Sequence, residues 1–188
     1  MARPAPSPAP ADADGAPTVL DPERYVPAFL TWIANKLSRG ASQHYLQAAG
    51  VGIETWRCLV QLALDGTTSA QQVARVIGMD KAAVSRCFKS MQADGLITFA
   101  ADADDGRLRL ARLTPKGRRL HDQILGIALA REQAFLSVLD AAERETLIGL
   151  LRRLHDHLPA VEAATADHVA RHFPPRARAR TTPSRTTS

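Results

Sequence analysis

The sequence is poor in several features that mark common protein classes. It has two cysteines in 188 residues, and no stretch approaches the roughly 20 apolar residues that a membrane-spanning helix requires. Its first residues lack the continuous apolar run of a secretory signal. We therefore expect a soluble cytoplasmic protein, without a membrane partner, whose thiols are reduced rather than joined in a disulfide.

Signatures of catalysis are also missing. The sequence contains no Gly-rich loop that could cradle a phosphate, no nucleophile elbow and no paired His and Cys arrangement. Its acidic residues are scattered over predicted helix caps and solvent-facing positions. We expect no enzyme activity, no catalytic residues and no cofactor.

The histidines do not predict a metal site. His155 and His157 are two residues apart and would point to different faces of a helix, whereas His168 and His172 are four apart but lie where the chain is losing order. No Cys or Glu is spaced to complete either pair. Structural or solvated histidines are the favoured interpretation, with no bound metal.

Two short helices joined by a tight turn are predicted in the middle of the chain. Ser69 and Gln72 form a capping box that begins the first helix. Gly78 allows the chain to leave that helix in the left-handed conformation, and Asp80 caps a second helix over residues 81–94. This is the pattern of a helix-turn-helix.

The second of these helices has one apolar and one basic face. Val84, Cys87, Phe88 and Met91 have the spacing of a buried helical stripe. The opposite face is narrow and rich in donors for phosphates and base edges, as a major-groove helix requires. The candidate DNA contacts on it are Lys81, Ala82, Ser85, Arg86 and Lys89.

A β-hairpin is predicted directly after this helix. Strands over residues 96–99 and 107–113 flank a turn over residues 101–106 that is rich in Asp, Ala and Gly. A basic hairpin beside a recognition helix suits the adjacent minor groove. The candidate contacts are Arg107 and Arg109, with Asp105 holding Arg107 in place.

Charge is concentrated on the same segment. Residues 75–119 carry ten basic and five acidic side chains, whereas residues 120–170 carry four and eight. A basic patch that coincides with DNA-reading geometry favours nucleic acid over a merely solvated helical face. The basic C-terminal segment, with five arginines and no acidic residue, is predicted to be a disordered tail that either adds phosphate contacts or has no specific role.

Four motifs resemble the MarR (multiple antibiotic resistance regulator) family of winged-helix repressors. They are Asp80-Lys81-x-x-Val84-Ser85-Arg86, Asp94-Gly95-Leu96-Ile97, Asp102-x-x-Asp105-Gly106-Arg107 and Leu113-Thr114-Pro115-x-Gly117. The resemblance covers about residues 25–158. The chain departs from the family at Ala103, where the family usually has Pro.

The resemblance implies a homodimeric regulator, usually a repressor, whose DNA affinity is lowered by small aromatic acids. In resembling proteins these acids bind where the first two helices meet the dimer helices. Arg39 is the preferred anchor because a guanidinium can hold a carboxylate through two parallel bonds. An ion pair for Arg39, and core positions for the two tryptophans, are the competing interpretations. The candidate positions are Trp32, Ser38, Arg39, His44 and Trp56. A nicotinate-type or hydroxybenzoate-type acid is the expected effector.

The remaining periodicity predicts a helical scaffold. A long helix opens at residues 21–23, and another helix spans residues 53–64. A helix of roughly 25 residues begins at Pro115, and a leucine-striped helix capped by Asp140 ends at Pro159. Because one winged domain cannot cover these apolar stripes, we expect them to interlock across a two-fold axis and to place two recognition helices about one DNA turn apart on a pseudo-palindromic operator.

The predicted fold is therefore mainly α with a small β-hairpin wing, in which a winged helix-turn-helix joins a helical dimerisation region as a two-fold homodimer. The predicted segments are a Pro/Ala-rich tail (1–20), a dimerisation and effector helix (21–52), the DNA-binding domain (53–114), dimerisation helices (115–170) and the basic tail (171–188). An oxidant-responsive thiol regulator, with Cys87 the better placed of the two cysteines, and a ligand-independent regulator remain alternatives. A helical protein-interaction module without DNA function is a further one.

Overall fold

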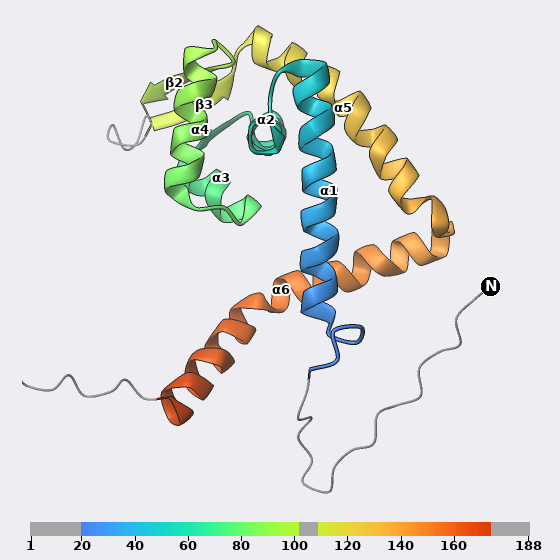
Figure 1. Ribbon diagram of the computed structural model, residues 1–188. Coiled ribbons are helices and arrows are strands. Elements are labelled where there is room, and N and C mark those ends of the chain that lie inside the picture. The colour runs from blue at the N-terminus through green and yellow to red at the C-terminus, as the bar shows by residue number, and fades with distance from the viewer. Residues whose placement is uncertain (1–19, 102–108, 174–188) are drawn as a thin grey trace, which may run out of the picture. The chain divides into compact units, whose positions relative to one another are not determined.

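A computed structural model describes residues 20–101 and 109–173 (Figure 1). The elements are α1 (Val26–Ala49), α2 (Ile53–Asp65), β1 (Thr67–Ser69), α3 (Ala70–Ile77), α4 (Lys81–Ala93), β2 (Ile97–Ala101), β3 (Arg109–Leu113), α5 (Pro115–Phe135), a 3₁₀ turn (Leu136–Val138) and α6 (Ala141–His172). The described residues form two compact units, which divide after Arg131. Within the described ranges, no helix combines the length and apolar content needed to cross a bilayer.

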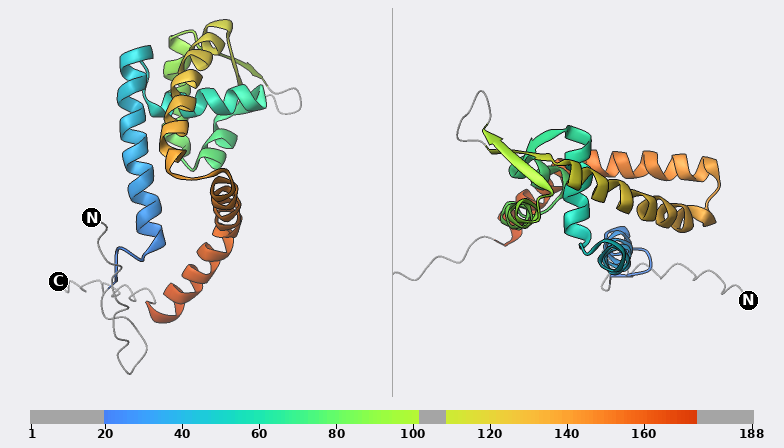
Figure 2. Two further views of the ribbon diagram at one scale, coloured as in Figure 1. Left: turned by 90° about the vertical axis from the view of Figure 1, so that its right-hand side faces the viewer. Right: turned by 90° about the horizontal axis from the view of Figure 1, so that it is seen from above.

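The first unit is a winged helix. Its three strands form an antiparallel sheet in the order β1-β3-β2, with Thr68 and Phe99 both opposite Ala111 on the central strand. The β2–β3 ladder, which we call the wing, extends beside α4 and away from the helical body (Figure 2). Strand β1 was not predicted from the sequence, because it is three residues long and its partner β3 lies some 40 residues further along the chain.

The core of this unit joins the helices α1 to α5 with strands β2 and β3. Its fully buried side chains include Leu59 and Leu62 of α2, Val73 of α3 and Phe88 of α4. Each apolar side chain of this size contributes about 1.5–3 kcal/mol when it is fully removed from water. The core therefore fixes α4 against α2 and the sheet, and the polar face of α4 is left outside.

The predicted helix ends are largely confirmed. Ser69 Oγ accepts a hydrogen bond from the Gln72 amide at 3.2 Å, although the Gln72 side chain bonds Arg75 instead of completing the capping box. Gly78 has φ 66°, the left-handed value expected for the turn after α3. At the other end of the chain, Asp140 and Glu143 form both bonds of a capping box at 2.9 Å.

Two predicted boundaries were wrong. The first helix begins at Val26 rather than at residues 21–23, because Asp21 accepts from the Glu23 amide in a turn that precedes the helix. α6 passes through Pro159 and continues to His172, so Arg171 and His172 belong to this helix rather than to the tail. The Ala-rich segment 160–170 consists largely of strong helix formers, which offset the backbone donor that proline lacks.

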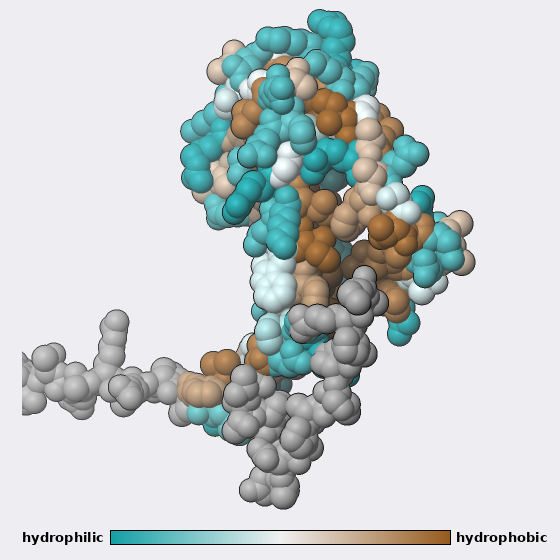
Figure 3. Space-filling view, turned by 45° about the vertical axis from the view of Figure 1, so that its right-hand side comes forward, coloured by the Kyte–Doolittle hydropathy of each residue, from teal (hydrophilic) through white to brown (hydrophobic). Residues whose placement is uncertain are grey.

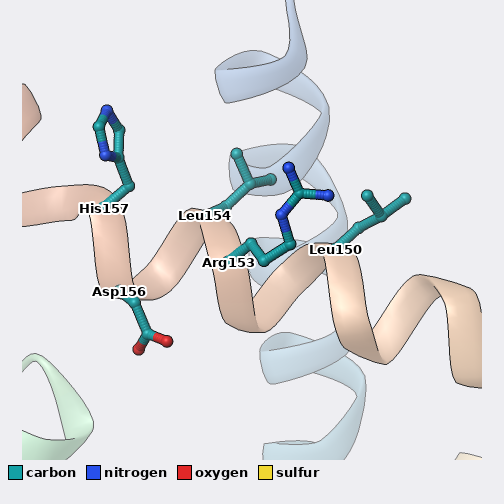
Figure 4. Close-up of a pocket in the computed structure, with 5 residues that line it drawn as sticks. All are labelled: Leu150, Arg153, Leu154, Asp156 and His157. Carbon is teal, nitrogen blue, oxygen red and sulfur yellow. The ribbon is translucent and has the colours of Figure 1, made fainter.

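α6 of the second unit presents an apolar stripe and buries none of its described side chains. Ile148, Leu150, Leu151, Leu154 and Leu158 are all more than a third exposed. Figure 4 shows Leu150, Leu154 and His157 pointing to the same side of the helix, whereas Asp156 points to the other. A helix with this stripe requires an apolar partner to be stable.

Candidate nucleic-acid interface

α4 is the predicted recognition helix, and its two faces separate as expected. Asp80 Oδ2 caps it by accepting from the Ala83 amide at 3.0 Å. Val84, Phe88 and Met91 are buried against the core. The predicted contact residues Lys81, Ala82, Arg86 and Lys89 are exposed, and Ser85 is half-buried.

The start of α4 is tied to the helix before it. Lys81 Nζ lies 3.4 Å from Gln71 Oε1 of α3, across the turn formed by Gly78 and its neighbours. The Met79 amide donates to the Ala74 carbonyl at 3.0 Å, which closes the end of α3. These bonds hold the two helices in a fixed arrangement at the surface that would meet DNA.

The basic side chains of strand β3 contact side chains of the neighbouring strand β2. The Arg109 guanidinium lies over the Phe99 ring, 4.3 Å from its centroid, and Phe99 packs on Phe88 of α4 with centroids 6.1 Å apart. Arg112 Nε donates to Thr98 Oγ1 at 3.3 Å. Arg107 and Asp105 lie outside the described residues, so the predicted contact between them stays a prediction.

Among the described residues, no carboxylate neutralises the basic surface. Among residues 20–101 and 109–173, no Lys or Arg lies within 4.0 Å of a carboxylate oxygen, and the two close pairs involve His121 with Asp122 and His155 with Asp156. The cations of α4 are therefore free of acidic partners within the described structure. This arrangement fits a polyanionic partner.

The end of α4 is fastened to the start of α5. Thr114 Oγ1 donates to the Gly95 carbonyl at 2.7 Å and accepts from the Gly117 amide at 3.1 Å. Lys116 Nζ donates to the Asp94 carbonyl at 2.7 Å. Gly117 is required at this contact, because a Cβ there would overlap the Leu96 carbonyl group.

The five candidate effector residues do not form one cluster. Trp32 and Arg39 line the same hollow on the outward face of α1, which has a volume of about 470 Å³ and is completed by Asn35, Lys36, Gly40 and Gln43. Trp56 lies in the core between Tyr45 and His121. Ser38 accepts from Arg57 Nη2 at 2.9 Å, and His44 is exposed but does not line this hollow.

Two residues near this region were missed by sequence reasoning. Arg131 Nη2 donates to the Leu37 carbonyl at 3.2 Å and lies against Gly40, where the absence of a Cβ lets the guanidinium approach α1. His121 is buried and stacked on Trp56, with ring centroids 5.4 Å apart. Burial raises the pKa of Tyr45, and the charge of Arg131 acts in the opposite direction. A glycine inside a predicted helix was the available signal for the Arg131 contact.

The structure also shows where the histidines and cysteines considered from the sequence lie. His168 and His172 lie one above the other on α6, with ring centroids 4.5 Å apart. No cluster of three or more His, Cys, Asp or Glu side chains arranged to hold a metal occurs in the described ranges. Cys58 is buried, Cys87 is half-buried, and both thiols are free.

Comparison with known proteins agrees with this geometry. A sequence profile of the MarR family matches residues 49–108. The crystal structure of a MarR/EmrR family transcriptional regulator from Acinetobacter sp. ADP1 is 30% identical, with a TM-score of 0.70, and the match covers 75% of this chain and 99% of that one. BpsR of Bordetella bronchiseptica, whose DNA binding is described as regulated by 6-hydroxynicotinic acid, is 26% identical with a TM-score of 0.60, over 68% of this chain and 91% of BpsR.

Curated sequences give shorter matches. The uncharacterized HTH-type transcriptional regulator YdgJ of Bacillus subtilis is 27% identical over 95 residues, which is 50% of this chain and 58% of YdgJ. The chain thus spans little more than half the length of the curated relatives that it matches.

Proposed function

Because the chain belongs to the MarR family, we propose that it is a sequence-specific transcriptional regulator that binds duplex DNA. The observation that carries the proposal is the exposed face of α4, where Lys81, Arg86 and Lys89 have no carboxylate partner among the described residues. Such side chains bind phosphates by displacing condensed counterions, and a helix of this shape reads base edges in the major groove. Ala82 and Ser85 complete the reading face, and Arg107 and Arg109 of the wing add minor-groove contacts, with Asp105 supporting Arg107.

The proposed regulator acts as a homodimer. The uncovered apolar stripe of α6 and the exposed Phe29 and Ile33 of α1 support this assembly. Hydrophobic side chains are visible at the surface in Figure 3. Pairing two copies would bury these residues and align two α4 helices with successive major grooves, about one DNA turn apart.

The proposed effector is a small aromatic carboxylic acid of the nicotinate or hydroxybenzoate type, which releases a repressor from its operator. The hollow on α1 supports this class of ligand, because it offers the Trp32 ring for stacking and the Lys36 and Arg39 cations for a carboxylate, with no acidic residue in its lining. The likeness to BpsR, whose DNA binding is regulated by 6-hydroxynicotinic acid, points in the same direction.

The proposed mechanism is a shift between two dimer geometries. A ligand can change DNA affinity only if it binds one geometry more tightly than the other. A ligand on α1 would favour a spacing of the two α4 helices that no longer matches the operator. Repression would then be lifted by a change in population rather than by unfolding of the winged domain.

Selection from a randomised duplex library followed by fluorescence anisotropy tests the DNA-binding proposal. The enriched sequence should be pseudo-palindromic, with half-sites about one helical turn apart. Affinity for it should fall steeply as salt is raised from 50 to 200 mM, by about 10³-fold or more if each dimer contacts six or more phosphates. A protein-interaction module would enrich no sequence, and that result would refute the proposal.

A further inference from the structure

A second hollow of the winged unit lies where the end of α1, the end of α4 and the start of α5 meet (Figure 1). We call it the junction pocket. Its volume is about 460 Å³, which falls within the range of about 300–1,000 Å³ that is typical of small-molecule sites. The proposed DNA contacts and the α1 hollow use none of its lining residues.

One wall of the junction pocket is a single face of α5. Four side chains of this helix have the i, i+3, i+4, i+7 spacing that brings residues together on one side. They are Lys116, Arg119, Leu120 and Gln123. The first two helical turns of α5 therefore present two cations, an amide and an aliphatic side chain to the same space.

Hydrogen bonds across the junction pocket hold its walls together. Lys116 Nζ donates to the Asp94 carbonyl at 2.7 Å, which ties α5 to the end of α4. Gln123 Nε2 donates to the Ala48 carbonyl at 2.9 Å, which ties the same helix to the end of α1. Because the walls are joined in this way, a ligand would have to order little of the chain when it binds.

Two opposite charges line the junction pocket without a counter-charge from the protein. They are the Arg119 guanidinium and the Asp94 carboxylate. Among residues 20–101 and 109–173, no Lys or Arg lies within 4.0 Å of a carboxylate oxygen, so these two groups are not paired with each other or with Lys116. The pocket thus offers one site for an anionic group and one for a cationic group.

The apolar part of the junction pocket is aliphatic. Leu96 is buried, and Val51 and Leu120 are half-buried. No aromatic ring is among the described residues that line this pocket, whereas the α1 hollow contains the Trp32 ring. The lining therefore suits a branched or linear hydrocarbon group rather than a flat ring that needs a stacking partner.

We propose that the junction pocket binds a free α-amino acid with an aliphatic side chain. Arg119 would hold the carboxylate through charge-assisted hydrogen bonds, and Asp94 would accept from the ammonium group. The hydrocarbon side chain would lie against Val51, Leu96 and Leu120. A simple carboxylic acid would leave the Asp94 charge unpaired beside it, and a simple amine would leave Arg119 unpaired. This ligand would be a second one, distinct from the aromatic acid proposed for the α1 hollow.

The test is isothermal titration calorimetry of the full-length protein with L-leucine, without DNA. We expect saturable binding of one molecule per chain. 4-Methylpentanoate lacks the ammonium group and 3-methylbutylamine lacks the carboxylate, so each should bind about tenfold more weakly or worse. Because no DNA is present, this binding and the proposed operator binding can each fail while the other stands.

Two variants test the assigned roles. Arg119→Gln should weaken L-leucine binding by about tenfold or more, because the carboxylate loses its charged donor. Asp94→Asn should weaken L-leucine binding by a similar factor but should not weaken 4-methylpentanoate binding. The Asp94→Asn change keeps the backbone carbonyl that accepts from Lys116, so the junction should stay intact.

Two control variants keep the junction pocket unchanged. Arg118 is exposed beside Arg119 on α5 but does not line the pocket, so Arg118→Gln should bind L-leucine normally. Arg39→Ala alters the α1 hollow and should also leave this binding unchanged. Circular dichroism checks that every variant is folded.

Three results would overturn the proposal. The first is the absence of saturable L-leucine binding to the unaltered protein. The second is an equal loss in Arg118→Gln and Arg119→Gln, which would indicate a general charge effect. The third is binding of 4-methylpentanoate as tight as that of L-leucine, which would make the pocket a site for simple organic acids.

Discussion

Gly117 of α5 packs so closely on Leu96 that a Cβ at position 117 would overlap the Leu96 carbonyl group. Leu113 Cδ2 lies 3.3 Å from the same point, so the glycine is enclosed by the end of α4 and by β3. The Leu96 carbonyl is a backbone group, which cannot move aside as the end of a flexible side chain could. This junction therefore requires glycine at position 117.

Gly117→Ala should lower the free energy of unfolding by about 2–4 kcal/mol, because backbone atoms must shift to admit the methyl group. Urea denaturation followed by circular dichroism measures the change. Gly126→Ala is the matched control on the same helix, where a Cβ meets no atom within 4 Å. That variant should raise stability by about 0.5–1 kcal/mol, and equal effects of the two changes would contradict the packing argument.

Arg86→Ala should weaken binding to the selected operator by about 1–3 kcal/mol without changing the oligomeric state. Arg86 is exposed on the reading face and has no acidic partner among the described residues. Its removal should therefore weaken DNA binding with little effect on the stability of the fold. Anisotropy titrations at fixed salt provide the measurement. Arg152→Ala of α6 removes the same charge outside α4 and should bind normally; equal losses would show a general charge effect.

Leu154→Glu should dissociate the proposed dimer, since it places a carboxylate in the middle of the apolar stripe of α6. Light scattering after size-exclusion chromatography distinguishes one chain from two. The control is again Arg152→Ala, which leaves the stripe intact. A Leu154→Glu protein that stays dimeric would move the interface away from α6.

Arg39→Ala should remove the thermal stabilisation by nicotinate-type or hydroxybenzoate-type acids while operator affinity without ligand is retained. The reason is that ligand binding raises apparent stability only while the carboxylate anchor is present. His44 lies outside the hollow that Arg39 lines, so the His44→Ala variant should still be stabilised by these acids. Loss of the response in His44→Ala alone would assign the anchor to a different face of α1.

Alkylation of Cys87 by iodoacetamide should titrate near neutral pH. The Cys58 hydrogen bond lowers the pKa of Cys87 to about 7, so the reactive thiolate is lost as pH falls below that value and is fully formed above it. The rate should fall about tenfold per pH unit below the midpoint. Mass spectrometry of the modified peptides separates Cys87 from Cys58, which should stay unmodified because it is buried and its pKa is raised. A Cys87 midpoint near the ordinary value of about 8.5 would remove the role given to the hydrogen bond.

Local sequence signals predicted several helix starts and the two faces of α4. Caps at Ser69, Asp80 and Asp140 fixed three helix starts, because a side-chain oxygen that satisfies free amides depends only on neighbouring residues. The apolar spacing of α4 likewise separated its buried and basic faces.

Features that depend on distant residues were not predictable in the same way. Strand β1 is defined by pairing with β3, and Pro159 is tolerated within a helix whose flanking sequence is strongly helical. The candidate effector residues do not lie together, because the packing of α1 on α2 determines which side chains face the core. Trp56 of α2 is buried in the core, whereas Arg39 of α1 lines a hollow at the surface. The contact of Thr55 with Cys87 likewise arises only when α2 packs on α4.

The bonds from Thr114 Oγ1 and Lys116 Nζ to the Gly95 and Asp94 carbonyls tie the start of α5 directly to the end of α4. A rotation of α5 would therefore move the C-terminal turn of α4 with it. Breaking these bonds would uncouple the exposed face of α4 from movements of α5.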